Sequence, residues 1–196
     1  MTADSMREPL LTERLLLRDC TEDDAATLLA LDHDPEVMRA VGSPPADDVG
    51  WYVERIRTVY IPHRRHPWHG IRLVVDRATG RFLGWVFVRP APASRDAEAF
   101  GWHDPREEEI GYRYLPDVWG RGIATEAARA LLRLALADPA TSAVVAAARS
   151  DNVRSRRVLA KLGLVTTGSV TLPGVDGPIV TFTLDRQDDG TWPGGV

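Results

Sequence analysis

The stretch from Pro116 to Leu132, PDVWGRGIATEAARALL, enters a helical pattern through small residues. The residues before it, EEIGYRYL, are typical of a β-strand, so the chain passes from strand to helix through a tight turn. The first backbone N–H groups of a helix have no partner within it, and the helix dipole adds partial positive charge there. Small residues let an anion approach this backbone closely. The stretch therefore predicts a pyrophosphate site, with Arg121 adding a formal positive charge.

This turn could belong to any of three kinds of strand–helix junction. A P-loop requires a terminal Gly-Lys-Ser or Gly-Lys-Thr, which is missing. A dinucleotide fingerprint, G-x-G-x-x-G, is met at Gly120 and Gly122, but Thr125 stands at the third glycine position. That fingerprint also needs a parallel βαβ unit and an acidic residue about 20 residues later; Asp138 has that spacing but follows a helix. The third kind is a tight strand–helix turn that binds nothing.

The rest of the chain alternates between strand-like and helix-like patterns. Helices are predicted at 21–32, from 35, and at 47–61, 123–137 and 152–162. Strands are predicted at 13–20, 71–76, 82–88, 108–115, 141–148, 164–172 and 178–185. Hairpin turns followed by strand–helix–strand alternation predict an α/β (α+β) fold with a mixed sheet of about seven strands. We expect a flexible leader over residues 1–10, one domain over 11–186 and a C-terminal tail over 187–196.

Composition narrows the functional classes. With 196 residues and 44% hydrophobic content, the chain supports one domain with a real core. A net charge of -4 does not favour a nucleic-acid partner. Cys20 is the single cysteine, which favours a reducing compartment, and no apolar run approaches a membrane span, so we expect a cytoplasmic protein with no membrane partner. His63, His66 and His69 have metal-like spacing, but Pro67 breaks the geometry, so no metal site is predicted.

Four segments resemble one family. WGRGIATEA resembles motif A of the GNAT superfamily of acyl-CoA-dependent N-acetyltransferases, Gln/Arg-x-x-Gly-x-Gly/Ala, with Trp119, Gly122 and Ala124 at its three positions. A Trp at the first position is usual in the branch that resembles ribosomal-protein N-terminal (alanine) acetyltransferases. EIGYRYLPD resembles that branch's fourth strand, DNVRSRRVLAKLGL resembles motif B, and TERLLLRDCTEDDAATL resembles the family start. In this order, the four segments make the resemblance specific over roughly residues 11–186.

The resemblance implies a GNAT fold, with a mostly antiparallel mixed sheet splayed between strands 4 and 5 and helices on both faces. It implies acetyl-CoA as the co-substrate, with no metal. The residues that it places at the coenzyme are Tyr114, Leu115, Trp119, Gly120, Arg121, Gly122, Ile123, Ala124, Thr125, Asn152 and Ser155. Arg154, Arg156 and Arg157 either meet the 3′-phosphate of CoA or form a solvated helix face.

Acetyl transfer from a thioester to an amine uses a base for the amine, a hydrogen-bond donor for the oxyanion and a group that assists the departing thiolate. Glu109 is expected beside the coenzyme and Glu108 on the other face, unless a bulge, which the family has, exchanges their roles. Backbone N–H groups near Tyr114 and Leu115 are the expected oxyanion donors. Ser155 is expected to contact the coenzyme or to relay a proton to the thiolate, because Leu159 replaces the tyrosine that serves as acid in many members.

The acceptor is expected to be a primary amine that attacks directly in a ternary complex. A protein N-terminal α-amine is favoured over a small-molecule amine (an antibiotic or polyamine), and both over a lysine side chain. The segments 61–70 and 90–105, with Trp68 and Trp102, are expected to frame the acceptor. A non-catalytic acyl-CoA-binding regulatory module is the alternative from another class, and homodimerisation stays open.

Overall fold

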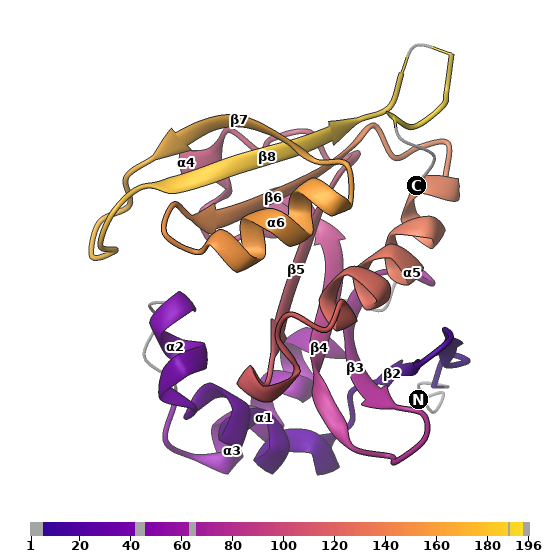
Figure 1. Cartoon of the computed structure of the whole chain (residues 1–196), viewed down its shortest axis with the longest axis vertical. Helices are drawn as coiled ribbons and strands as arrows, with labels where there is room; N and C mark the ends of the chain where they lie inside the picture. Colours follow the sequence, from indigo (N-terminus) through magenta and orange to yellow (C-terminus); the bar gives the residue numbers. More distant parts are fainter. Residues whose placement is uncertain (1–5, 42–45, 63–65, 188, 194–196) are drawn as a thin grey trace.

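A single mixed sheet of eight strands, in the order β1-β2-β3-β4-β5-β6-β8-β7, organises the computed structural model (Figure 1). The structure describes residues 6–41, 46–62, 66–187 and 189–193. All neighbouring strands pair antiparallel except β5 and β6, which run parallel. The strands are β1 (Leu10–Leu11), β2 (Leu15–Asp19), β3 (Gly70–Asp76), β4 (Phe82–Pro90), β5 (Glu107–Tyr114), β6 (Ala143–Arg149), β7 (Val165–Val170) and β8 (Ile179–Asp185).

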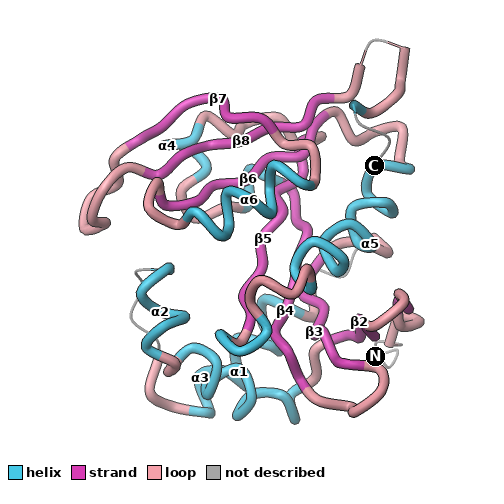
Figure 2. Tube along the Cα trace, viewed as in Figure 1, coloured by secondary structure: helices cyan, strands magenta, loops and turns pink. Residues whose placement is uncertain are grey.

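Helices cover both faces of this sheet (Figure 2). They are α1 (Ala25–Asp32), α2 (Pro35–Val41), α3 (Val49–Arg55), α4 (Ala97–Phe100), α5 (Ile123–Ala137) and α6 (Val153–Lys161). Two consecutive residues of β3 belong to different apolar clusters: Val74 packs with the α5 residues, whereas Leu73 packs with residues of α1 and α3. Because successive strand residues point to opposite faces, α5 lies on one face and α1 and α3 on the other. Among the described residues, no helix is long and apolar enough to cross a membrane.

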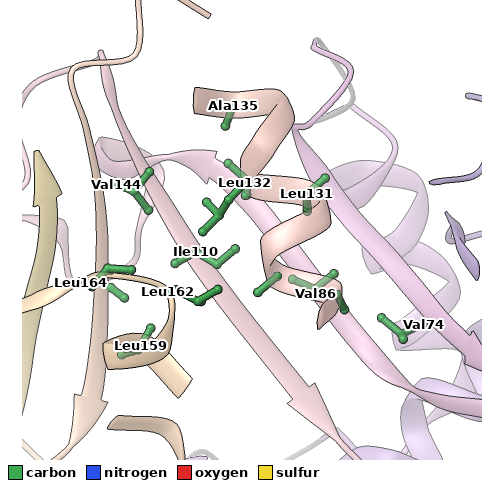
Figure 3. Packing of buried hydrophobic residues seen from close by; sticks show 14 of the residues in the cluster. Val74, Val86, Ile110, Leu131, Leu132, Ala135, Val144, Leu159, Leu162 and Leu164 are labelled. Carbon is green, nitrogen blue, oxygen red and sulfur yellow. The ribbon is translucent and has the colours of Figure 1, made fainter. Parts of the chain in front are cut away.

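The main apolar cluster joins the two halves of the sheet (Figure 3). Leu131 and Leu132 of α5 are fully buried over Val86 of β4 and Ile110 of β5. Leu159 of α6 belongs to the same cluster, as do residues of β6 and β8. Helix α5 therefore packs on the first half of the sheet, while α6 continues the same core over the second half.

The predicted fold class is confirmed, with small differences in the elements. The sheet has eight strands rather than about seven, because Leu10 and Leu11 pair with Leu17 and Leu16 to form β1. A two-residue strand has no periodicity that a sequence pattern can reveal. The region 90–105, predicted as a polar connection, contains a short 3₁₀ turn and α4, with Trp102 buried beneath them.

Described residues near both ends of the chain, Arg7 and Trp192, contact the domain. The sequence predicts a flexible leader over residues 1–10, yet Arg7 forms an ion pair of 2.6 Å with the buried Asp19 of β2 and also donates to the carbonyl of His69. At the other end, the Trp192 indole donates to the carbonyl of Leu136, 2.9 Å away, and lies against the main core. Segments on both sides of the expected boundaries thus contribute contacts to the domain.

The backbones of β4 and β5 approach closely at Gly84, and a substitution there tests this approach. Its φ is +151°, and a Cβ at this position would lie 2.2 Å from the carbonyl oxygen of Arg113. We expect Gly84→Ala to lower the free energy of unfolding by about 3 kcal/mol, from backbone strain and overpacking together. Gly80→Ala is the matched control: its φ is +72° with no atom within 4 Å, so only strain of about 1 kcal/mol applies. Urea denaturation of both variants measures the difference, and equal losses would contradict the close approach of β4 to β5.

Candidate active site

A cleft of about 880 Å³ lies where β5, the start of α5 and the start of α6 meet. Helix α2 contributes its opposite wall, through Glu36, Val37 and Arg39. The other residues that line the cleft are Tyr112, Arg113, Tyr114, Val118, Trp119, Gly120, Gly122, Ile123, Ala124, Thr125, Asp151, Asn152, Val153, Arg154, Ser155, Arg157, Val158 and Lys161. The cleft thus brings together segments that are far apart in the sequence.

The cleft exists because β5 and β6 separate. They pair only from Glu107↔Ala143 to Glu109↔Val145, although both strands continue beyond these residues. The predicted splay between these strands is therefore present, and it leaves the edge of β5 beyond Glu109 without its parallel neighbour. The β4–β5 register runs without a shift from Gly84↔Tyr114 to Pro90↔Glu108, so the bulge that would exchange Glu108 and Glu109 does not occur in this strand.

The free backbone groups on this edge belong to alternate residues. The N–H of Leu115 donates to the carbonyl of Leu83 at 2.9 Å, so the expectation that this N–H is unpaired is wrong. Tyr114 is the next residue along the antiparallel pair, and its N–H and C=O therefore point away from β4, toward the splay. The Trp119 indole already donates to the Tyr114 carbonyl at 2.9 Å, whereas the Tyr114 hydroxyl is buried without a hydrogen-bond partner among the described residues.

Glycines shape the start of α5. Gly120 and Gly122 have φ values of +77° and +79°, which favour residues without a Cβ, and Gly122 is the N-cap. The N–H of Glu126 donates to the carbonyl of Gly122 at 3.0 Å, so the N–H groups of Ile123, Ala124 and Thr125 precede the helical ladder. These three residues line the cleft together with both glycines.

Arg121 behaves differently from its neighbours. Its side chain is exposed and it does not line the cleft, while Gly120 and Gly122 on either side do. Its carbonyl accepts a hydrogen bond of 3.0 Å from Arg14, whose guanidinium also forms an ion pair of 2.6 Å with Glu126. Arg14 therefore ties the turn to the first turn of α5. The sequence pattern identified the turn, but not the arginine that supports it from the segment before β2.

The first turn of α6 provides polar groups on the other side of the splay. Asn152 is the N-cap: its side-chain oxygen accepts from the N–H of Ser155 at 3.0 Å, which leaves the amide NH₂ of Asn152 as a donor. The Ser155 hydroxyl lies 3.1 Å from the Tyr112 hydroxyl, which also donates to the carbonyl of Ser155 at 3.1 Å. Leu159, at the position of the missing tyrosine, is 1% exposed and belongs to the core.

The two candidate bases lie on opposite faces of β5 in different surroundings. Glu108 is 6% exposed and accepts hydrogen bonds from the Trp68 indole and from Nε2 of His69, the latter at 2.7 Å. Glu109 pairs with Arg89, whose Nε lies 2.6 Å from Glu109 Oε2. Neither glutamate lines the cleft, although Glu109 belongs to the last register pair before the strands separate.

Basic side chains of α6 gather along the cleft. Arg154, Arg157 and Lys161 line it, and the Arg154 guanidinium lies 5.0 Å from the centre of the Trp119 ring. Arg156 instead donates to the carbonyl of Ser150. The positions 154, 157 and 161 share one helix face by their spacing, and this periodicity is the signal that separates them from Arg156.

The histidine-rich loop is described only in part, and the histidines that the structure does describe lie close together. His63 lies outside the described residues. The rings of His66 and His69 are 4.7 Å apart, but Nε2 of His69 is engaged by Glu108. Trp68, expected to frame an acceptor, is buried in the main core, and no group of three or more metal-ligating side chains occurs among residues that can be placed.

Solved structures with this fold include acetyltransferases. The aminoglycoside acetyltransferase AAC(6')-Ib in complex with coenzyme A matches with a TM-score of 0.68 and 24% identity, over 88% of this chain and 95% of that one. An acetyltransferase (GNAT family) from Bacillus anthracis matches with a TM-score of 0.71 and 17% identity, over 91% of this chain and 98% of that one.

Curated relatives and a family model extend this similarity to the sequence. FsC-acetyl coenzyme A-N(2)-transacetylase of Aspergillus fumigatus is 28% identical over 185 residues, which cover 90% of this chain and 76% of that protein. The uncharacterized protein YkkB of Bacillus subtilis is 30% identical over 164 residues, which cover 79% of this chain and 84% of that protein. The family model described as acetyltransferase (GNAT) domain matches residues 14–165. The chain therefore belongs to the GNAT acetyltransferase family and is an acetyl-CoA-dependent N-acetyltransferase.

Proposed function

We propose that this enzyme transfers the acetyl group of acetyl-CoA to a protein N-terminal α-amine. The observation that carries the proposal is the engagement of both candidate bases: Glu108 is held by Trp68 and His69, and Glu109 by Arg89. An amine with a low pKa suits such a site. A protein α-amine has a pKa of about 7.7–8.0, against about 10.4 for lysine, so a useful fraction is already neutral near pH 7.

The coenzyme fits the cleft through backbone groups and small residues. We place its pyrophosphate at the N–H groups that begin α5, where a Cβ on Gly120 would meet no atom within 4 Å and the backbone is therefore open. Its pantetheine arm follows the free edge of β5 at Tyr112 and Tyr114. Asn152 lines the same cleft, and its amide NH₂ offers a donor to this arm. Arg154, Arg157 and Lys161 supply positive charge for the phosphates.

Glu109 remains the better candidate base. Arg89 occupies Oε2 of Glu109 and leaves Oε1 to accept a proton, directly or through water. The neutral amine attacks the thioester carbonyl, the C–N bond forms, the C–S bond breaks, and one amine proton passes to Glu109 or to water. The backbone N–H of Tyr114 faces the splay. Five residues at about 3.3 Å each separate Tyr114 from Glu109, so this N–H is placed to bind an amide of the pantetheine arm rather than the oxyanion.

A small-molecule amine is the second candidate acceptor. Two similar proteins carry names that indicate such chemistry: the FsC-acetyl coenzyme A-N(2)-transacetylase and the aminoglycoside acetyltransferase. The cleft also contains more basic than acidic side chains: Arg39, Arg113, Arg154, Arg157 and Lys161 against Glu36 and Asp151. Because Arg154, Arg157 and Lys161 are assigned to the coenzyme phosphates, only Arg39 and Arg113 remain against Glu36 and Asp151. The charge of the cleft therefore does not favour one class of acceptor over the other.

The helix start generates a binding prediction. We expect Gly122→Val to abolish CoA binding with the fold retained, because a β-branched residue at a φ of +79° displaces the N–H groups that begin α5. Its Cβ would also lie 3.5 Å from Nη2 of Arg14, which supports this turn. Gly174→Val is the matched control, since Gly174 also has a positive φ, of +73°, but lies in a distant turn with no atom within 4 Å of the added Cβ. Calorimetry with CoA measures the affinity, and circular dichroism checks the fold. Equal CoA affinity in both folded variants would remove the pyrophosphate from this turn.

The two glutamates generate a kinetic prediction. Glu109→Gln is expected to lower kcat about 100-fold at pH 7, with partial recovery at higher pH as the amine loses its own proton. Glu108→Gln is expected to keep kcat but to lower the free energy of unfolding by about 1–3 kcal/mol, because it disturbs buried hydrogen bonds to Trp68 and His69. A loss of kcat in the Glu108 variant with a silent Glu109 variant would reverse the assignment.

Competition decides the acceptor class. Short peptides with free N-termini are expected to accept acetyl groups, while the same peptides blocked at the α-amine stay inert even when they contain lysine. A panel of small amines, including an aminoglycoside and a polyamine, serves as the comparison. Fast turnover of a small amine beside equally inert free and blocked peptides would replace the N-terminal acceptor with a small molecule.

A further inference from the structure

We propose that the Tyr112 hydroxyl, supported by Ser155, donates a hydrogen bond to the departing sulfur of CoA. The inference rests on the coenzyme placement proposed above. Tyr112 lines the cleft, as does Ser155, and their hydroxyl oxygens are 3.1 Å apart. No described residue of α6 offers a tyrosine for this task, because Leu159 is buried in the core. The phenol in the cleft that lies against the start of α6 is therefore that of Tyr112 on β5, next to the Ser155 hydroxyl.

The position of Tyr112 matches the path of the thioester. It lies three residues beyond Glu109, the last residue of β5 that pairs with β6. Its side chain reaches across the splay to the first turn of α6, where it donates to the carbonyl of Ser155 at 3.1 Å. The pantetheine arm must pass this bridge to bring the thioester to the point where the strands meet, beside Glu109.

The chemistry of the phenol defines what it contributes. Burial raises the pKa of Tyr112 to about 12, and the hydrogen bond with Ser155 opposes this only partly. The phenol is therefore protonated at neutral pH and remains a donor. A thiol has a pKa of about 8.5, so the thiolate does not take the proton from this phenol completely. Tyr112 thus stabilises the thiolate by a charge-assisted hydrogen bond and keeps its proton.

Ser155 completes the arrangement. When the Tyr112 proton turns from Ser155 to the sulfur, the Ser155 hydroxyl donates to the phenol oxygen and strengthens its O–H as a donor. In the step itself, the C–S electron pair moves to sulfur as the new C–N bond forms. The thiolate leaves with the hydrogen bond from Tyr112 and takes its proton from water on release. Ser155 is accordingly a positioning residue, while Tyr112 touches the reacting atom.

The thiol pKa of bound CoA tests the hydrogen bond from Tyr112 to sulfur, and this measurement needs no acceptor. The thiolate absorbance of the CoA complex is followed over about pH 6–10, which brackets a thiol pKa of about 8.5, with the complex of S-ethyl-CoA as the non-ionising baseline. We expect the thiol pKa of bound CoA to lie about one unit lower in the wild type than in Tyr112→Phe, a tenfold change in the thiol–thiolate equilibrium. Tyr60→Phe, on the face of α1 and α3, is the control and is expected to match the wild type.

A second variant distinguishes loss of the hydrogen bond from a structural effect of Tyr112→Phe. Incorporation of 3-fluorotyrosine at position 112 makes the phenol a stronger donor at nearly the same size, so the bound thiol pKa is expected to fall below the wild-type value. A merely structural role for Tyr112 predicts no such fall. Equal thiol pKa values in the wild-type, Phe and fluorotyrosine complexes would overturn the inference while leaving CoA binding intact. Failure of the wild type to bind CoA would overturn the coenzyme placement itself, and the inference with it.

Discussion

The parallel pairing of β5 with β6 ends after Glu109 and Val145, and the geometry of the cleft follows from that point. A parallel neighbour would occupy the edge of β5 with its own hydrogen bonds. Because β6 diverges, the peptide group of Tyr114 and the side chain of Tyr112 face an opening instead of a strand. The starts of α5 and α6 then lie on the two sides of this opening, so three sets of polar groups face one cleft.

The opening requires compensation, since the ladder hydrogen bonds lost there would otherwise hold the two half-sheets together. The apolar cluster supplies it. Residues of β4 and β5, of α5 and α6, and of β6 and β8 all belong to one buried group, which includes Val86, Ile110, Leu132, Leu159 and Phe182. Such packing is not directional, so it can join the halves while their backbones separate. The hydrogen bonds between Tyr112 and Ser155 add a polar link across the same gap.

The sequence predicted those parts of the site that depend on local backbone chemistry. The glycine-rich helix start, the Asn152 cap and the order of the elements are all encoded within a few residues, and the structure has them where the patterns indicate. The partners of the charged side chains depend on strand register and on distant loops. This is why the Arg89–Glu109 pair, the His69–Glu108 contact and the use of the Leu115 N–H by Leu83 could not be predicted. The role of Arg121 as a site cation depends on the direction of one exposed side chain, which a motif does not determine.

The donors at the start of α5 are peptide N–H groups, and this has a consequence for how the chain can vary. Apart from the two positions with positive φ, the turn presents the same N–H groups whichever side chains accompany them. In the proposed coenzyme placement, substitutions at Ala124 or Thr125 that respect the available space change the surroundings of the phosphates but not the N–H groups offered to them. The loops outside this turn can therefore vary in sequence without loss of the backbone N–H groups proposed to bind the coenzyme. In the proposed placement, the donors of α5 to the pyrophosphate thus depend on backbone conformation, so a change of acceptor specificity elsewhere in the chain does not require their loss.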